Sequence, residues 1–340
     1  MEEKKYELTD DSRIIHTPRD GFKLVRRIRA LPGCSIPGVK PGDLGGYVES
    51  EKNLSHEGQC WVHDDAIICG DAFVSDDAEV RDRARVYDCV RVCGRAKVYG
   101  HARLYNRVQV AGYAQVYDYA KVSDGAQVYD YARVYNRAKV SERAKIHDNV
   151  EIYGYAVACG TMEAYGDARI YEHAFVGGYA KVYNSARIHG RAYIFSGANV
   201  HGCAVVCGKA RAYDFVEIYG HASLSGHIEI YGFARVHGNA SLGGRAQICN
   251  FARIYGNAKI HGHARVCDCA TVYENAEVYD YAEICDDSQV FGCARVYNRA
   301  KVCDNSQIFG HVRICGDSLI VYDSKVNDRG AVANVMAKVA

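Results

Sequence analysis

The chain contains few of the residues that interrupt regular structure or dominate an ordinary globular core. Its 340 residues include four prolines, three methionines and a single tryptophan, Trp61. The 42 Lys and Arg nearly balance the 41 Asp and Glu, giving a formal net charge of +1. Nucleic acid is therefore not a favoured partner, because no global positive field attracts it. No stretch approaches the roughly 18 consecutive apolar residues of a membrane helix, so no membrane association is expected.

A secretory leader is also missing from the start of the chain. The first residues, MEEKKYELTDDSR, are charged and lack the apolar segment of such a leader. Fifteen cysteines in a chain of this kind are expected to be reduced thiols that serve as small side chains. A cytoplasmic location is therefore the expectation.

What the sequence has in abundance is a repeat of six residues. Counted in sixes from Val62 to Val332, 46 positions carry Val, Ile or Leu except at Ala158, Ala164 and Ala212. A small residue, usually alanine, stands two places before each aliphatic residue. Gly, Asp or Asn stands two places after it, except at Glu142, Glu172, Ser196, Glu274 and Tyr322. Such strict periodicity indicates a repeat architecture.

Each column of the repeat has a structural explanation. The alternation of inward small, outward polar and inward aliphatic residues is typical of a half-buried strand. The Gly, Asp or Asn that follows tolerates the left-handed backbone angles of a sharp turn. Three such hexads close a triangular coil, so equivalent side chains recur every eighteen residues. The sequence predicts an all-β fold, a single-stranded left-handed parallel β-helix of about 15 coils.

The two ends differ from the repeat. Residues 1–59 lack it, and we expect them to form a small cap over the first coil, with a strand in FKLVRRIRAL (22–31) and Trp61 packed at the junction. The predicted domains are thus a cap (1–59), a β-helix (60–336) and a tail (337–340). The apolar end, GAVANVMAKVA (330–340), either folds across the last coil or favours self-association.

The lead-in PGDLGGYVESEKNLSHEGQCWV (41–62) resembles the segment before the repeats in YdcK-like hexapeptide-repeat proteins of bacteria and phages. The similarity is carried by Gly45–Gly46–Tyr47, Asn53–Leu54–Ser55 and Cys60–Trp61–Val62. The resemblance implies a short N-terminal segment followed by a long uninterrupted β-helix. Proteins of that group are often labelled transferases by fold analogy alone, so the resemblance implies no defined activity.

Outward side chains fall into lines along the predicted helix. One aromatic line comprises Tyr99, Tyr117, Tyr135, Tyr153 and Tyr171, and a second includes Tyr129, Tyr165, Tyr183, Tyr219, Tyr255 and Tyr273. A basic line comprises Arg85, Arg103, Lys121 and Lys139, beside corner residues Arg83, Arg107, Arg137 and Arg143. The aromatic lines are either stacked structural faces or a binding surface for a glycan, a nucleobase array or another protein. The basic line is either a solvated face or a docking surface for an anionic partner.

A strict line of thiols comprises Cys249, Cys267, Cys285 and Cys303. A linear row does not supply the tetrahedral ligands of a zinc site, so we expect structural thiols and no metal, with a redox or metal role open.

Histidines are weak catalytic candidates, because acyltransferases resembling this fold use a histidine base at a trimer interface. The candidates are His201, His237, His261 and His263. Those enzymes usually carry a projecting loop and a C-terminal helix, which this sequence lacks, and each of these histidines occupies a position that Tyr, Asn or Arg takes in other hexads.

Three functions therefore remain open. The first is a non-enzymatic scaffold that presents Tyr-rich and basic faces to a partner and needs no cofactor. The second is an acyl-CoA-dependent acyltransferase acting as a trimer. The third is a self-assembling structural protein, since residues 79–148 carry a charge balance of +6 and residues 268–328 one of −6, which favours head-to-tail contacts.

Overall fold

The computed structural model describes residues 4–17, 19, 21–328 and 330–332. The chain divides into two compact units, an N-terminal unit (Met1–Glu172) and a C-terminal unit (His173–Ala340). Both are built from coils of short parallel strands, and among the described residues the one helical segment is the 3-10 turn η1 (Glu51–Asn53). This confirms the predicted fold class, a parallel β-helix with 18 residues per turn.

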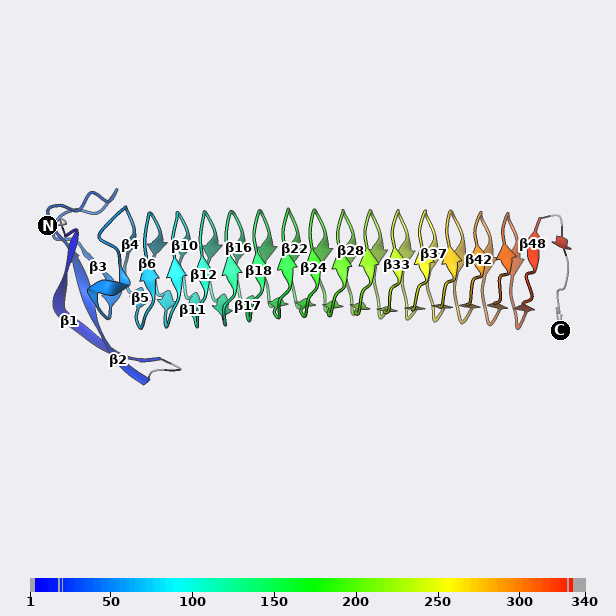
Figure 1. The fold of residues 1–340 in the computed structure, drawn as a ribbon, viewed down its shortest axis with the longest axis horizontal. Coiled ribbons are helices and arrows are strands. Elements are labelled where there is room, and N and C mark those ends of the chain that lie inside the picture. Colours follow the sequence, from blue (N-terminus) through cyan, green and yellow to red (C-terminus); the bar gives the residue numbers. More distant parts are fainter. Residues whose placement is uncertain (1–3, 18, 20, 329, 333–340) are drawn as a thin grey trace. The chain divides into compact units, whose positions relative to one another are not determined.

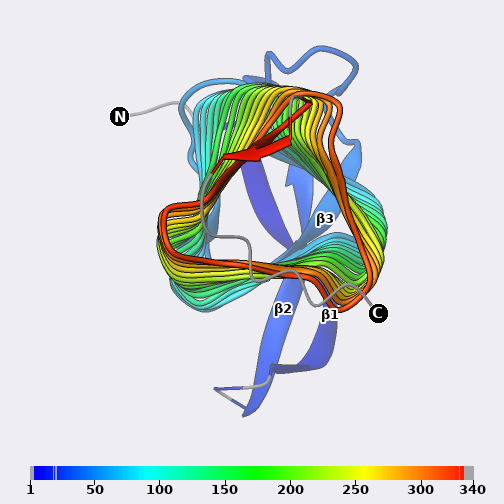
Figure 2. The ribbon, with the colours of Figure 1, turned by 90° about the vertical axis from the view of Figure 1, so that its right-hand side faces the viewer.

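Three faces make up each coil of the N-terminal unit (Figures 1 and 2). The first face contains β5 (Ile67–Ile68), β8 (Arg85–Val86), β11 (Arg103–Tyr105), β14 (Lys121–Ser123), β17 (Lys139–Val140) and β20 (Val157–Ala158). The second contains β6 (Phe73–Val74), β9 (Arg91–Val92), β12 (Gln109–Val110), β15 (Gln127–Val128), β18 (Lys145–Ile146) and β21 (Glu163–Ala164). The third contains β4 (Trp61–Val62), β7 (Glu79–Val80), β10 (Lys97–Val98), β13 (Gln115–Val116), β16 (Arg133–Val134), β19 (Glu151–Ile152) and β22 (Arg169–Ile170).

The C-terminal unit repeats this construction. Its first face runs from β23 (Phe175–Val176) to β47 (Leu319–Ile320), its second from β24 (Lys181–Val182) to β48 (Lys325–Asn327), and its third from β25 (Arg187–Ile188) to β46 (Arg313–Ile314). A last strand, β49 (Gly330–Val332), reverses direction and pairs antiparallel with β48. The predicted tail and the rest of the apolar end, residues 333–340, lie outside the described residues.

The interior is formed by the two inward columns of the repeat. Side chains such as Ala84, Val86, Ala258 and Ile260 have no exposed surface. Each buried aliphatic side chain contributes about 1.5–3 kcal/mol to stability, and equivalent ones stack from coil to coil. The core is therefore continuous within each unit and leaves only outward residues for function.

The turn column adopts the left-handed conformation that the sequence predicts. Asp82 has φ of 58° and Gly100 of 68°. Even the exceptions conform, since Glu142 and Tyr322 have φ of 62° and 60°. Where the column holds aspartate, the carboxylate often accepts a hydrogen bond from the backbone N–H of the next coil, as Asp82 Oδ2 does from Gly100 N at 2.8 Å.

The N-terminal segment forms an antiparallel hairpin, β1 (Tyr6–Thr17) and β2 (Gly21–Ala30), which confirms the expected strand at 22–31. The hairpin contacts the first coils: Arg13 forms an ion pair with Asp65 at 3.1 Å, and Arg19 donates to Asn106 Oδ1 at 3.3 Å. β2 pairs with β3 (Leu44–Val48), which in turn pairs parallel with β5, Tyr47 opposite Ile67. Stacking of coils therefore begins upstream of residue 60, at a spacing of twenty residues in place of eighteen.

Close packing explains the lead-in motif. A Cβ on Gly45 would lie 2.6 Å from Val62 O, and one on Gly46 would lie 2.6 Å from Ala66 O, so only glycine fits between β2 and the first coil. Trp61 is buried and meets Tyr6 edge-on at 6.3 Å, as expected for the junction. The buried Asn53 donates from Nδ2 to Gly70 O and Ala72 O, which satisfies carbonyl groups of the adjoining coil.

Candidate functional site

A groove of about 590 Å³ lies along the first face of the N-terminal unit. We name it the basic groove. It is lined by Arg83, Arg85, His101, Arg103, Tyr119, Lys121, Arg137, Lys139 and Tyr155. Six of these side chains are permanent cations, and no carboxylate is among the described residues that line it.

One wall of the groove is the predicted basic line, here named the cation ladder: Arg85, Arg103, Lys121 and Lys139. The strands β8, β11, β14 and β17 place each of these residues opposite the next, so that Arg85 pairs with Arg103, Arg103 with Lys121, and Lys121 with Lys139. Like charges in directly opposed positions destabilise a sheet. The cation ladder therefore has an electrostatic cost that the fold alone does not require.

Some other charged columns reduce this cost by alternating signs, although single like-charged pairs also occur, at Arg235 opposite Arg253 and at Arg295 opposite Arg313. On the third face, Glu151 forms ion pairs with Arg133 at 3.6 Å and with Arg169 at 3.3 Å. In the C-terminal unit, Glu283 pairs with Arg265 at 3.6 Å and with Lys301 at 3.3 Å in the column equivalent to the cation ladder. Within the described part of the chain, none of the six cations of the basic groove has such a carboxylate partner.

The second wall of the groove lies two residues before each strand, at the corner of each coil. His101 and Tyr119 stack at 4.8 Å, and the Arg137 guanidinium lies 5.7 Å from the Tyr119 ring and 5.6 Å from the Tyr155 ring. Tyr119 thus has His101 on one face and Arg137 on the other. Only the edge of the Tyr119 ring, which carries the positive part of the aromatic quadrupole, can therefore contact a ligand in the groove.

All six cations of the groove were predicted as part of the basic line or its corner residues, but the aromatic wall was not predicted. His101, Tyr119 and Tyr155 share a column with Arg83 and Arg137, and the mixture of Arg, His and Tyr concealed it. Aligning every outward position with the residues eighteen places before and after it would have revealed this column. The other predicted corner residues, Arg107 and Arg143, line a different depression of about 450 Å³ with Asp124 and Lys145.

The first predicted aromatic line forms a continuous tyrosine ladder on another corner of the N-terminal unit. Tyr99, Tyr117, Tyr135, Tyr153 and Tyr171 stack with ring centroids 4.8 to 4.9 Å apart and nearly parallel planes. The rings are half-buried, and burial raises the pKa of Tyr117 and Tyr135 to about 12. Because neighbouring rings cover each other's faces, the ladder presents ring edges and hydroxyl groups rather than flat stacking surfaces.

The second aromatic line is also a stack of rings whose faces cover one another. In the N-terminal unit His147 stacks between Tyr129 and Tyr165 at 4.8 and 5.4 Å. In the C-terminal unit His201 lies between Tyr183 and Tyr219 at 4.5 and 5.0 Å. The same stack continues through His237, Tyr255 and Tyr273 to Phe291 and Phe309.

The structure places the candidate catalytic histidines in aromatic stacks. Burial lowers the pKa of His201 and His237, and for His237 the nearby Arg235 and Arg253 lower it further. Neither imidazole has a side-chain hydrogen-bond partner among the described residues. His261 and His263 lie on either side of Gly262 in one turn and stack on Tyr279 and Tyr281, at 4.9 and 4.8 Å. A catalytic assignment for these four histidines stays a prediction.

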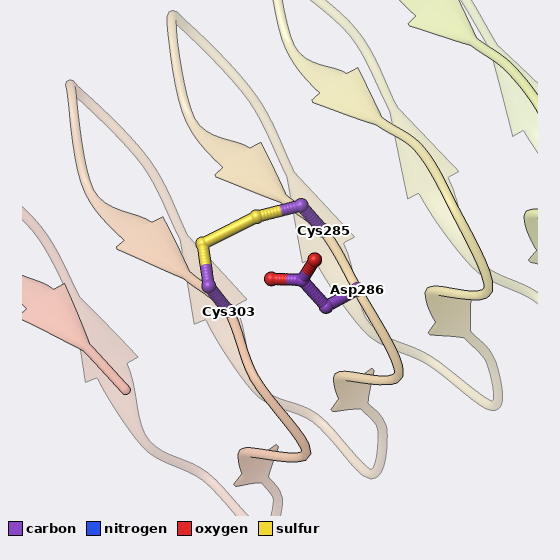
Figure 3. Close-up of side chains that lie close together, drawn as sticks. All are labelled: Cys285, Asp286 and Cys303. Carbon is purple, nitrogen blue, oxygen red and sulfur yellow. A yellow bond between two sulfur atoms is a disulfide. The ribbon is translucent and has the colours of Figure 1, made fainter. Parts of the chain in front are cut away.

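The cysteine line departs from expectation at one pair. Cys249, Cys267, Cys285 and Cys303 are buried together, but Cys285 and Cys303 form a disulfide with Cα atoms 4.9 Å apart (Figure 3). The expectation of reduced thiols throughout is therefore wrong for this pair. Stacked coils bring equivalent residues within the Cα separation that a disulfide needs, about 4.4–6.8 Å. Burial and the adjacent Asp268 raise the pKa of the Cys267 thiol to about 12, which keeps it protonated.

No described helix is long and apolar enough to cross a membrane. Comparison of the chain with protein-family models and with curated proteins yields no match. The class of protein is therefore defined by the fold: a hexapeptide-type repeat scaffold built as a parallel β-solenoid.

Proposed function

We propose that this repeat scaffold binds an anionic partner along the basic groove. The observation that carries the proposal is the cation ladder, in which Arg85, Arg103, Lys121 and Lys139 oppose one another without intervening carboxylates. A polyanion laid along the ladder would supply the missing counter-charges. The alternating ladder at Arg265, Glu283 and Lys301 demonstrates that the same fold accommodates neutral pairing in this column.

The shape of the site supports binding rather than catalysis. The groove follows the first face of the solenoid across successive coils, and its lining contains no carboxylate that could orient His101 as a general base. Arg guanidinium groups supply paired N–H donors that match carboxylate, sulfate and phosphate groups. Membership of the YdcK-like group, based on the lead-in motif, and a cytoplasmic location are part of this proposal.

The test measures retention of the full chain on immobilised heparin, inorganic polyphosphate and poly-glutamate. The groove variant is Arg103→Gln with Lys121→Gln. The matched control is Arg265→Gln with Lys301→Gln, which removes two cations from the equivalent column of the C-terminal unit, where both are paired. We expect the groove variant to elute at clearly lower salt and the control to elute like the wild type, since unpaired cations dominate the attraction. Equal shifts for the two variants, or no retention of the wild type on any matrix, would overturn the proposal.

A further inference from the structure

We propose that the partner in the basic groove is a linear acidic polysaccharide with one carboxylate per sugar ring, lying along the direction in which the coils stack. This inference rests on the proposed function and specifies its ligand. Three features of the groove lead to it: its donors, its spacing and its covered ring faces.

The groove offers hydrogen-bond donors almost exclusively. Its Arg and Lys side chains have no acceptor atoms, and the side-chain acceptors in the lining are limited to the hydroxyl groups of Tyr119 and Tyr155 and one ring nitrogen of His101. A peptide brings one N–H per residue that needs an acceptor. An acidic glycan instead brings carboxylate, ring and glycosidic oxygens as acceptors, and its hydroxyl groups rotate to suit either need. The lining therefore matches a glycan better than an acidic peptide.

Spacing along the groove is set by the stacking of coils. Equivalent cations recur once per coil, at the inter-strand distance of about 4.8 Å. A polysaccharide that carries one carboxylate on every ring advances by about one ring length between charges, a repeat comparable with one coil. The charges of polyphosphate lie much closer together, so most of them would face no partner in the cation ladder.

The aromatic wall does not favour single-stranded nucleic acid. Proteins that bind single strands stack bases on the faces of aromatic side chains. Here Tyr119 has both faces occupied, by His101 at 4.8 Å and by Arg137 at 5.7 Å. Its positive edge instead adds to the attraction for oxygen atoms.

The experiment is isothermal titration of the full chain with oligogalacturonates of two to eight rings. Controls are the methyl-esterified hexamer, which keeps the sugars but loses the charges, a polyphosphate of matched charge, and a single-stranded oligonucleotide. We expect affinity to rise with length until the oligomer spans Arg85 to Lys139 and then to level off. The esterified hexamer should bind at least about tenfold more weakly, and so should the hexamer on the Arg103→Gln, Lys121→Gln variant. The Arg265→Gln, Lys301→Gln control should bind the hexamer as the wild type does.

The outcomes separate the two proposals. Tight binding of polyphosphate or oligonucleotide without binding of the hexamer would overturn the polysaccharide inference and leave the proposed binding of an anionic partner in the basic groove in place. Equal binding of the esterified and free hexamers would also overturn it, because the carboxylates would then not be recognised. Absence of binding to every polyanion would overturn both proposals. Unfolding curves of each variant establish that it is folded, and the single variant Lys121→Gln repeats the test if the double variant is not.

Discussion

At the residue scale, hydrogen bonding explains why aspartate is as suitable as glycine at many positions of the turn column. Glycine adopts positive φ at no steric cost, whereas aspartate pays part of that cost and gains a hydrogen bond to the next coil. Asp76 Oδ2 accepts from Gly94 N, and Asp148 Oδ2 accepts from Gly166 N, both at 2.8 Å. The second bond lowers the pKa of Asp148. Each such carboxylate ties one coil to the next outside the strands.

Substitution at Asp82 separates these two contributions. Asp82→Ala loses both the tolerance of positive φ and the bond to Gly100, and should cost about 2–3 kcal/mol of unfolding free energy. Asp82→Gly loses the bond but relieves the steric cost of positive φ, and should cost about 1 kcal/mol or less. Asp82→Asn keeps an acceptor oxygen and serves as the control. Urea unfolding and hydrogen exchange at the Gly100 amide measure both effects; equal costs for alanine and glycine would contradict this account.

Protonation of the stacked histidines predicts a dependence of stability on pH. Because burial lowers the pKa of His201 and His237, the unfolded chain binds more protons than the folded chain below about pH 6.5. The free energy of unfolding should therefore fall as pH falls through that value and level off below the folded pKa values. In the variant His201→Tyr with His237→Tyr, which keeps the stack, this fall should be smaller. Urea unfolding between about pH 5 and pH 8 measures it, and identical slopes in both proteins would refute it.

At the element scale, a strand of two residues has no stability of its own and depends on the strands one coil before and after. The side chains opposed across those strands therefore set the local energy. Alternating ladders such as Arg133, Glu151 and Arg169 gain a favourable pairing, while the cation ladder opposes like charges. We therefore expect the cation ladder to lower the free energy of unfolding relative to an alternating ladder in the same column.

The variant Lys121→Glu tests that interpretation. It converts Arg103, Lys121 and Lys139 into an alternating ladder and should raise the unfolding free energy by about 0.5–1 kcal/mol. Retention on polyanions should fall in the same protein. The control Lys301→Glu places a second carboxylate beside Glu283 and should destabilise. Chemical unfolding of the two variants measures the effect, and a destabilised Lys121→Glu would count against a functional origin for the cation ladder.

At the scale of the whole molecule, coils are interchangeable modules. Deletion of residues 217–234 removes eighteen residues of the C-terminal unit and joins equivalent positions, so every column stays in register. The shortened chain should fold with a cooperative transition, because each coil contacts only its neighbours. Deletion of residues 217–233 shifts the columns by one, turns buried side chains outward and should prevent folding of that unit. Circular dichroism and sedimentation distinguish the two outcomes, and similar behaviour of both would refute the modular account.

The repeat made most of the fold predictable from sequence, because the same three columns specify strand, core and turn at every hexad. Where the repeat stops, prediction weakened. The pairing of β3 with β5 at a spacing of twenty residues depends on Gly45 and Gly46 fitting under neighbouring backbone, which no period reveals. Likewise, the cation ladder was predictable because its residues recur every eighteen positions in one column. The aromatic wall of His101, Tyr119 and Tyr155 was not, because the sequence does not show which corner of the coil lies beside that column. The Cys285–Cys303 bond could not be chosen among equally spaced thiols.

The reversal of the chain at β49 limits how copies of the protein could add to one another. On the second face of the C-terminal unit, β49 occupies the edge of β48 where a further parallel strand would otherwise align. An unpaired edge of that kind can seed the growth of a fibril from incoming chains. A second molecule that continued the coils of the first would therefore have to displace β49 before one of its own strands could pair with β48.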